Sequence, residues 1–365
     1  MKIVKLMLPL LALVLLFQCK TARSLEGTVP ISATITKEGW IDCFEKGLTA
    51  NGQPIWCEAS AILYDGKNIF VANDKDMPDT RSSVFYWAFK NGFADTTQAA
   101  QYLTNPVLKY GKKFEDFSLT PDGKTVFLST GFDRVKPNSK EWNAYNTIYY
   151  WQVGNENNPN VLRENSTDSS SVFLREKFSK ALTSPEFPQG MPYFKIEGLA
   201  ATNDRLYFGV REEGKKFDDF KYRVKIITVN YHLNNGTVEL ENNYKVISDI
   251  NIAGLPPNFK QPMGISSIEY DHFNNRFLIL TSFENGEKTG GYLWTATESE
   301  LESNKMNLVR DGRGSPIAFS DKSEDIAIIN KKKIIIIHDD DRFLPIVGGV
   351  KRQPQQAAYS VVEFK

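Results

Sequence analysis

The chain has 365 residues, with 44 acidic and 44 basic side chains, so its formal net charge at pH 7 is zero. This balance gives no strong field that would attract nucleic acid or an anionic membrane surface, which excludes both as partners held by net charge. Aromatic residues make up 12% of the chain, and short apolar runs alternate with turn residues. This composition predicts an all-β domain.

The first residues are typical of an export signal. Lys2 and Lys5 precede an apolar run over residues 6–17, which is too short to span a bilayer, since a spanning helix needs roughly 20 apolar residues. The run ends at Cys19 within Leu-Phe-Gln-Cys. This ending resembles a bacterial lipobox, whose cysteine becomes the lipidated first residue of the mature protein. The alternative is an ordinary signal peptide with an incidental cysteine.

We therefore predict a lipoprotein with a signal peptide over residues 1–18, a tether over residues 19–26 and a single domain over residues 27–365. Acyl chains on Cys19 would anchor the protein to a membrane of the bacterial cell envelope. Lys20 stands where many inner-membrane lipoproteins carry aspartate. The outer membrane is therefore the expected location, with the domain facing the periplasm or the surface.

Cys43 and Cys57 are the remaining cysteines. Two thiols in an exported protein usually pair, and closing so short a loop contributes roughly 3 kcal/mol. We predict a disulfide between them. The alternative is a pair of reduced, buried thiols, and two cysteines alone cannot form a structural zinc site, which needs four ligands.

One pattern recurs along the chain: a strand of small and apolar residues, an Asp-centred turn, a second strong strand and then a third. Repeated small sheets at spacings of roughly 50 to 80 residues predict the blades of a β-propeller, whereas a β-sandwich would not repeat this pattern. We predict five blades, with six as the alternative. The five units begin at Glu58, Glu115, Glu197, Gly264 and Gly314. In the fifth unit, we predict that the second strand starts at Asp325.

The two ends of the chain supply further strands, at residues 31–36 and 359–364. Pairing them in one blade would close the propeller and remove an open sheet edge. Between the second and third units, residues 154–194 form a polar insertion with a short helix predicted around Phe178. A long insertion in a compact domain is often functional, and the alternative is a tolerated surface loop.

These residues resemble a family of exported propellers of unknown function that is related to the esterase-like phytase domain and, more remotely, to gluconolactonase-type propellers. The resemblance depends on Ile-Glu-Gly-Leu-Ala at 196–200, followed by a strand that ends at Arg211, and on Gly264 followed by Tyr-Leu-Trp at 292–294. It implies a propeller fold and, less directly, esterase or lactonase chemistry. After Arg211 the chain has Glu-Glu-Gly-Lys, where we associate Gly-Pro with that family.

The candidate site follows from the repeat, because equivalent positions of propeller blades face one central channel. Glu58, Glu115 and Glu197 begin three inner strands, and their carboxylates would repel each other unless a basic group or a divalent cation joins them. Oxygen ligands suit Ca²⁺ first and Mg²⁺ second. The alternative is that each glutamate has a local structural role. Four further candidate ligand-binding residues follow second strands near the same rim: Asn73, Asp74, Asp133 and Arg211.

The sequence offers no serine elbow, phosphate-binding glycine loop or convergent histidines. We therefore expect a monomeric binding module for a protein or a small ligand, and leave its status as an enzyme open. The alternative is a metal-dependent hydrolase of a phosphoester, ester or lactone, with the three glutamates on the metal and Arg211 on an anionic group.

Overall fold

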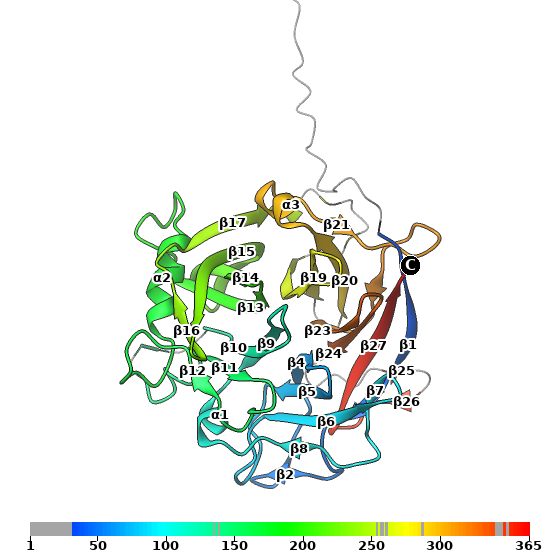
Figure 1. Cartoon of the computed structure of the whole chain (residues 1–365). Coiled ribbons are helices and arrows are strands. Elements are labelled where there is room, and N and C mark those ends of the chain that lie inside the picture. The colour runs from blue at the N-terminus through cyan, green and yellow to red at the C-terminus, as the bar shows by residue number, and fades with distance from the viewer. Residues whose placement is uncertain are drawn as a thin grey trace, which may run out of the picture.

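The computed structural model describes residues 31–365 except 134–135, 138, 253–254, 256–258, 260–261, 286–287, 340–345 and 348–349. Five antiparallel sheets stand around a common centre, as Figure 1 shows; the innermost strand comes first in the chain in four of them, and in the fifth it is β23 (Ser323–Asn330). The five-bladed propeller predicted from the repeat is therefore confirmed, without a sixth blade in this part of the chain. The predicted lipidation site, Cys19, lies outside the described residues, in which no helix is long and apolar enough to cross a membrane.

The blades follow the chain in order. Blade 1 contains β4 (Ala59–Tyr64), β5 (Asn68–Asn73), β6 (Val84–Lys90), β7 (Phe93–Ala94) and β8 (Gln101–Tyr102). Blade 2 contains β9 (Phe114–Leu119), β10 (Thr125–Thr130), β11 (Ile148–Gln152) and β12 (Asn160–Val161). Blade 3 contains β13 (Tyr193–Ala201), β14 (Arg205–Lys216), β15 (Asp219–Asn234), β16 (Thr237–Leu240) and β17 (Lys245–Ile250). Blade 4 contains β18 (Met263–Asp271), β19 (Arg276–Asn285), β20 (Lys288–Ala296), β21 (Asn307–Leu308) and β22 (Ala318–Phe319).

Blade 5 joins the two ends of the described chain. It contains β23 (Ser323–Asn330), β24 (Lys333–His338), β27 (Gln356–Phe364) and β1 (Ala33–Asp42). The register of β1 against β27 runs from Ala33 opposite Phe364 to Asp42 opposite Gln356, which confirms the predicted closure. The assignment of the fifth unit was wrong: Asp325 belongs to the inner strand, and β22 is an outer strand of blade 4. Because β24 pairs with β27 from the end of the chain, the local order of strands in sequence was misleading.

Short elements connect the blades. Helix α1 (Pro106–Tyr110) starts at Asn105, whose side chain accepts from the Val107 N–H, and has proline at its first position. Helix α2 (Phe173–Ala181) is the helix predicted around Phe178, and α3 (Glu298–Glu302) starts with a capping box at Thr297. Two small hairpins are β2 (Thr49–Ala50) with β3 (Gln53–Pro54), and β25 (Ile346–Val347) with β26 (Val350–Lys351).

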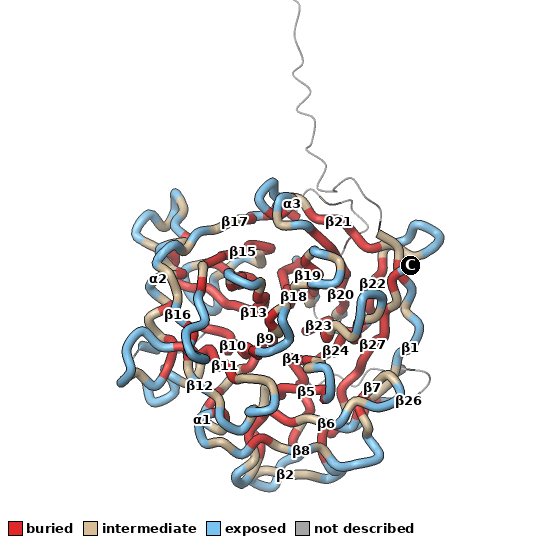
Figure 2. The backbone as a smooth tube through the Cα atoms, in the orientation of Figure 1, coloured by how far each residue is buried: buried red, intermediate tan, exposed pale blue. Residues whose placement is uncertain are grey.

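The core lies between the blades. Each of five apolar clusters combines side chains from two neighbouring sheets: for example, Phe70 of blade 1 packs with Trp151 of blade 2, and Ile335 of blade 5 shares a cluster with Ile69 of blade 1. Inner and middle strands are therefore buried on both faces, as Figure 2 shows, and carry apolar runs such as the four isoleucines of β24. Such face-to-face packing fixes the inner strands around the channel.

The predicted disulfide is confirmed. Cys43 and Cys57 are bonded, with their Cα atoms 6.2 Å apart. The bond joins the end of β1 in blade 5 to the segment that enters blade 1, so it lies at the closure of the ring.

Candidate functional site at one mouth of the channel

Every inner strand is interrupted at an equivalent position. There its pairing with the next strand skips one of its residues, which is a β-bulge and turns that side chain away from the regular alternation. Because the interruption recurs in all five blades, the five bulged residues surround one end of the channel, which we call the mouth. They are Ser60, Glu115, Glu197, Ser266 and Glu324.

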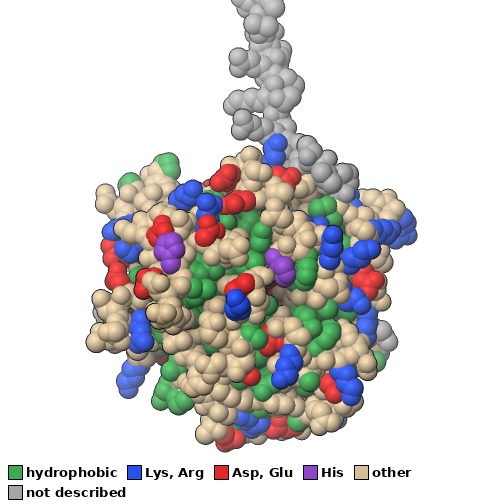
Figure 3. Space-filling view, in the orientation of Figure 1, with side chains coloured by type: hydrophobic (Ala, Val, Ile, Leu, Met, Phe, Trp, Pro, Cys, Tyr) green, Lys and Arg blue, Asp and Glu red, His purple; other side chains and the backbone are tan. Residues whose placement is uncertain are grey.

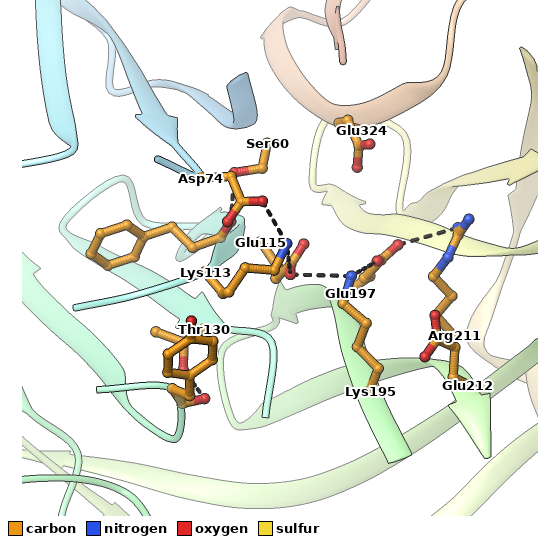
Figure 4. Close-up of polar contacts among 12 residues, drawn as sticks. Ser60, Asp74, Lys113, Glu115, Thr130, Lys195, Glu197, Arg211, Glu212 and Glu324 are labelled. Carbon is orange, nitrogen blue, oxygen red and sulfur yellow. Dashed lines mark hydrogen bonds and ion pairs between the residues drawn. The ribbon is translucent and has the colours of Figure 1, made fainter. Parts of the chain in front are cut away.

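This ring differs from the predicted one at two places. Glu115 and Glu197 are equivalent, as predicted, but Glu58 precedes the equivalent residue of blade 1, Ser60, by two positions. Glu324 takes the third glutamate position, and the sequence analysis missed it because blade 5 was assigned wrongly. Figure 4 shows Glu115, Glu197 and Glu324 directed toward a common space.

A lysine precedes each of these three glutamates by two residues: Lys113, Lys195 and Lys322. The recurring Lys-x-Glu is the signal that could have identified Glu324 from sequence, because residues two apart on a strand lie on the same side. The three ammonium groups alternate with the carboxylates around the mouth. The complete mouth cluster consists of Glu58, Lys75, Asp74, Lys113, Glu115, Lys195, Glu197, Arg211, Glu284, Lys322 and Glu324.

Lys195 lies at the centre of this cluster. Its Nζ is 3.2 Å from Glu115 Oε1 and also bonds Glu197 Oε1, so one ammonium bridges two carboxyl groups. On one side, Lys113 Nζ is 3.7 Å from Glu115 Oε1 and 2.5 Å from Asp74 Oδ2. These contacts account for burial of several charges in one place, because each has an opposite charge within reach.

The second half of the cluster is built on Arg211. Its Nη1 lies 3.2 Å from Glu197 Oε2, and its Nη2 lies 3.2 Å from Glu284 Oε1. Lys322 Nζ lies 3.0 Å from Glu284 Oε1 and 2.9 Å from Glu324 Oε1, so it connects these two carboxyl groups. The Arg211 guanidinium also stacks on Tyr222, and a Cβ at Gly264 would lie 2.8 Å from Arg211 Cγ, so glycine there gives the arginine its room.

The two carboxyl groups that share Lys195 have opposite pKa shifts. Burial raises the pKa of Glu115 to about 7, although Lys195 and Lys113 act in the other direction. Burial also acts to raise the pKa of Glu197, but the positive charges of Arg211 and Lys195 outweigh it and lower the pKa to about 2. At neutral pH the pair therefore contains a group that can donate a proton beside a group that stays ionised.

Glu324 is a second buried acid of this kind. Burial raises its pKa to about 8, and the negative charge of Glu197 adds to the effect, against the positive charge of Lys322. Its side chain is 4% exposed. Of the three ring glutamates, two therefore titrate near neutral pH, and Glu197 stays a carboxylate between the cations.

The remaining predicted residues lie around this centre. Glu58 pairs with Lys75 at 2.5 Å, and the Asn73 amide donates to the carbonyl groups of Trp56 and Lys75. Asp133 is buried after β10, and its charge raises the pKa of both Lys113 and Lys195, which places it beside the cluster. Among the described residues, no contact brings Glu58, Glu115 and Glu197 around one point, so Ca²⁺ or Mg²⁺ at these residues stays a prediction.

Three more carboxyl groups lie deeper in the channel. Asp116, Glu269 and Asp325 are buried and place ligand atoms within 4.8 Å of one another, the one such acidic group found among the described residues. We call them the carboxyl hub. Backbone N–H groups from all five inner strands donate to Asp116 or Asp325: those of Ile62, Phe117, Leu199, Ile268 and Ile326.

A proton lies between two members of the hub. Burial and the neighbouring charge of Asp325 raise the pKa of Asp116 far above its usual range, and the two carboxyl groups place oxygens within 4.8 Å of each other. Asp116 therefore holds a proton at neutral pH beside the Asp325 carboxyl group. The hub therefore acts as a shared acceptor that ties the five inner strands together.

A polar hollow of about 580 Å³ opens beside the mouth. It shares Asp74, Lys75 and Lys113 with the mouth cluster, and Lys112 and Lys136 extend it outward. The opposite face of the propeller, which carries the β18–β19 turn, is drawn in Figure 3 and has basic and acidic side chains interspersed over it. The hollow provides a route by which a small molecule can reach the lysines of the mouth.

Comparison with known proteins gives remote likenesses. No family model and no curated protein matches the chain, so the resemblance to propellers related to the esterase-like phytase domain stays a prediction. Solved structures that are similar include a GH62 hydrolase in complex with xylotriose, at 11% identity and a TM-score of 0.44, over 88% of this chain and 96% of that one. Another is the catalytic domain of a GH62 α-L-arabinofuranosidase from Coprinopsis cinerea, at 10% identity and a TM-score of 0.41, over 92% of this chain and 97% of that one. A third is a GH43 endo-arabinanase from Bacillus licheniformis, at 10% identity and a TM-score of 0.37, over 86% of this chain and 96% of that one. The strand order described above, and not these likenesses, defines the protein as a five-bladed propeller with a charged mouth.

Proposed function

We propose that the mouth of the channel is the active site of a hydrolase that cleaves glycosidic bonds. Glu115 would act as the general acid and Glu197 as the base or nucleophile. The observation that carries this proposal is the opposite pKa shift of two carboxyl groups held by the same ammonium, about 7 for Glu115 and about 2 for Glu197. Glycoside hydrolysis is a reaction class for which such a pair supplies both the acid and the base or nucleophile.

The chemistry follows from the positions of the two groups. Glu115 and Glu197 extend from neighbouring blades toward Lys195, whose ammonium lies between them, so the mouth offers one bond a proton donor from one blade and a carboxylate from the next. The donor protonates the leaving oxygen, and the carboxylate attacks the sugar carbon or activates a water molecule. Arg211 keeps Glu197 ionised, and its own charge is fixed at every pH of interest.

The sequence favoured a binding module because it offered no acid, base or nucleophile. The proposed pair fills that gap, so we place the hydrolase first. No step of this mechanism depends on a metal ion. The site of action remains the one expected from the N-terminus, a bacterial cell envelope to which Cys19 would anchor the domain.

The test is an assay with a panel of aryl glycosides, in which hydrolysis is measured by the release of the aryl group. Glu115→Gln and Glu197→Gln should each lower kcat/KM by about 10² to 10⁴-fold, the usual contribution of a positioned acid or base. The matched control is Glu213→Gln, because Glu213 is also buried and bonds Lys225 at 2.6 Å but lies outside the mouth cluster. Absence of hydrolysis across the panel, or full activity in both mouth variants, would contradict the proposal.

A further inference from the structure

At the mouth, the three lysines that precede the ring glutamates are more exposed than those glutamates. The side chains of Lys113, Lys195 and Lys322 are 17%, 11% and 12% exposed. Those of the three ring glutamates are only 2% to 4% exposed. Around Lys113 and Lys195, away from the partly exposed Glu284 beside Lys322, a ligand therefore meets ammonium groups before the ring glutamates, which favours a ligand with a negative charge.

Two of these ammonium groups retain hydrogen-bonding capacity. An ammonium has three N–H donors. Two carboxyl groups contact Lys113, those of Asp74 and Glu115, and two contact Lys195, those of Glu115 and Glu197. Each lysine can therefore direct one further N–H toward an anionic oxygen of a ligand, in the strong charge-assisted form of the bond.

The wall beside these lysines carries acceptors that need donors. Asp74 Oδ1 and Asn73 Oδ1 are buried and have no hydrogen-bond partner, although the other oxygen of Asp74 bonds Lys113. Buried acceptors without partners are costly and are often completed by a ligand. Of the two residues only Asp74 lines the hollow, and a hydroxyl group is a donor that matches its open carboxylate oxygen.

We infer that the mouth and the adjoining hollow bind a polyol that carries an anionic group, with a hydroxyl on Asp74 and the anion on Lys113 and Lys195. A hollow of about 580 Å³ has the size of a site for a sugar-sized molecule. This inference rests on the proposed function, because it specifies that the sugar bound by the proposed hydrolase is an acidic one. The anionic group is a carboxylate or a phosphate, and both belong to the same ligand chemistry.

The experiment measures the melting temperature of the purified protein with D-glucuronate, D-galacturonate, D-glucose 6-phosphate and D-glucose as probes. At about ten times its dissociation constant an acidic sugar should raise the melting temperature by roughly 2 °C or more, since it binds only the folded protein. D-Glucose, which lacks the anion, should give a clearly smaller shift at the same concentration. The two uronates and the phosphate distinguish a carboxylate from a phosphate ligand.

Lys113→Gln should abolish the shift with the acidic sugars and leave the small effect of glucose. The matched control is Lys225→Gln, because Lys225 is a buried lysine that bonds two carboxylates, those of Glu213 and Asp249, away from the mouth. Its response should equal that of the wild type. Equal shifts with acidic and neutral sugars, no shift with any of the four, or a full response in Lys113→Gln would overturn the inference.

The outcome is separable from that of the proposed function. Binding of acidic sugars that depends on Lys113, without hydrolysis of any aryl glycoside, would leave the ligand class standing and remove the hydrolase. Hydrolysis of neutral glycosides that depends on Glu115 and Glu197, without preference for acidic sugars, would do the reverse.

Discussion

The mouth cluster and the carboxyl hub are built from adjacent residues of the same strands, yet they neutralise buried acids in different ways. Glu115 and Glu324 belong to the mouth, and the next residues, Asp116 and Asp325, belong to the hub. At the mouth the counter-charges are Lys113, Lys195, Arg211 and Lys322. In the hub they are backbone N–H groups and a proton.

The difference separates a chemical site from a structural one. Cations at the mouth act unequally, so Glu197 is strongly acidic while Glu115 and Glu324 titrate near neutral pH. In the hub, the carboxyl groups share a raised pKa and point their oxygens at the five strands. Proton transfer in catalysis requires neighbouring groups with contrasting pKa values, which the mouth provides. The carboxyl groups of the hub all have raised pKa values, and these only stabilise the closed ring at low pH.

The largest effect on stability is expected from the bridging ammonium of the mouth. Lys195→Met should lower the free energy of unfolding by about 3 to 5 kcal/mol, because it leaves the carboxyl groups of Glu115 and Glu197 buried without their shared counter-charge. Urea unfolding measures this change. Lys90→Met is the exposed control, since its pair with Asp95 is a surface ion pair and should contribute less than about 1 kcal/mol. Equal effects in both variants would refute the role given to Lys195.

A smaller and asymmetric effect is expected in the hub. Asp116→Asn places an amide N–H where Asp116 holds its proton, so it should change the free energy of unfolding at pH 7 by less than about 1 kcal/mol. Asp325→Asn should cost about 1 to 3 kcal/mol, because both oxygens of Asp325 accept hydrogen bonds and an amide nitrogen cannot accept. Reversal of this order in urea unfolding would show that the proton lies on Asp325.

The same pair of variants gives a pH test. Raised pKa values mean that the folded protein binds more protons than the unfolded one, so these groups stabilise the fold at low pH and lose that contribution as pH rises. Between about pH 5 and pH 8 the wild type should therefore lose the contribution of Glu324, whose pKa is raised from 4.5 to about 8, and Asp116, whose pKa is also raised, acts in the same direction. Asp116→Asn removes one of these protons and should flatten the decline, by on the order of 1 kcal/mol.

The sequence predicted the architecture better than the site. The repeat and the two terminal strands identified five blades and their closure, because apolar runs and Asp-centred turns are local signals. Glu58 was placed two residues out of register, because the turn between β4 and β5 is two residues shorter than the turn between β9 and β10. Glu324 was missed because its blade is completed by β27 and β1 from the chain ends, and Arg211 meets Glu197 only through the pairing of β13 with β14.

The central claim is that Glu115 carries a proton at neutral pH while Glu197, on the same ammonium, does not. The direct measurement is a ¹³C NMR titration of glutamate side-chain carboxyl groups, with Glu115→Gln and Glu197→Gln used to assign the two resonances. We predict that the Glu115 carboxyl titrates near pH 7 and that the Glu197 carboxyl stays ionised at every pH above about 4. If both groups are fully ionised at pH 5.5, the acid and base assigned to this mouth do not exist.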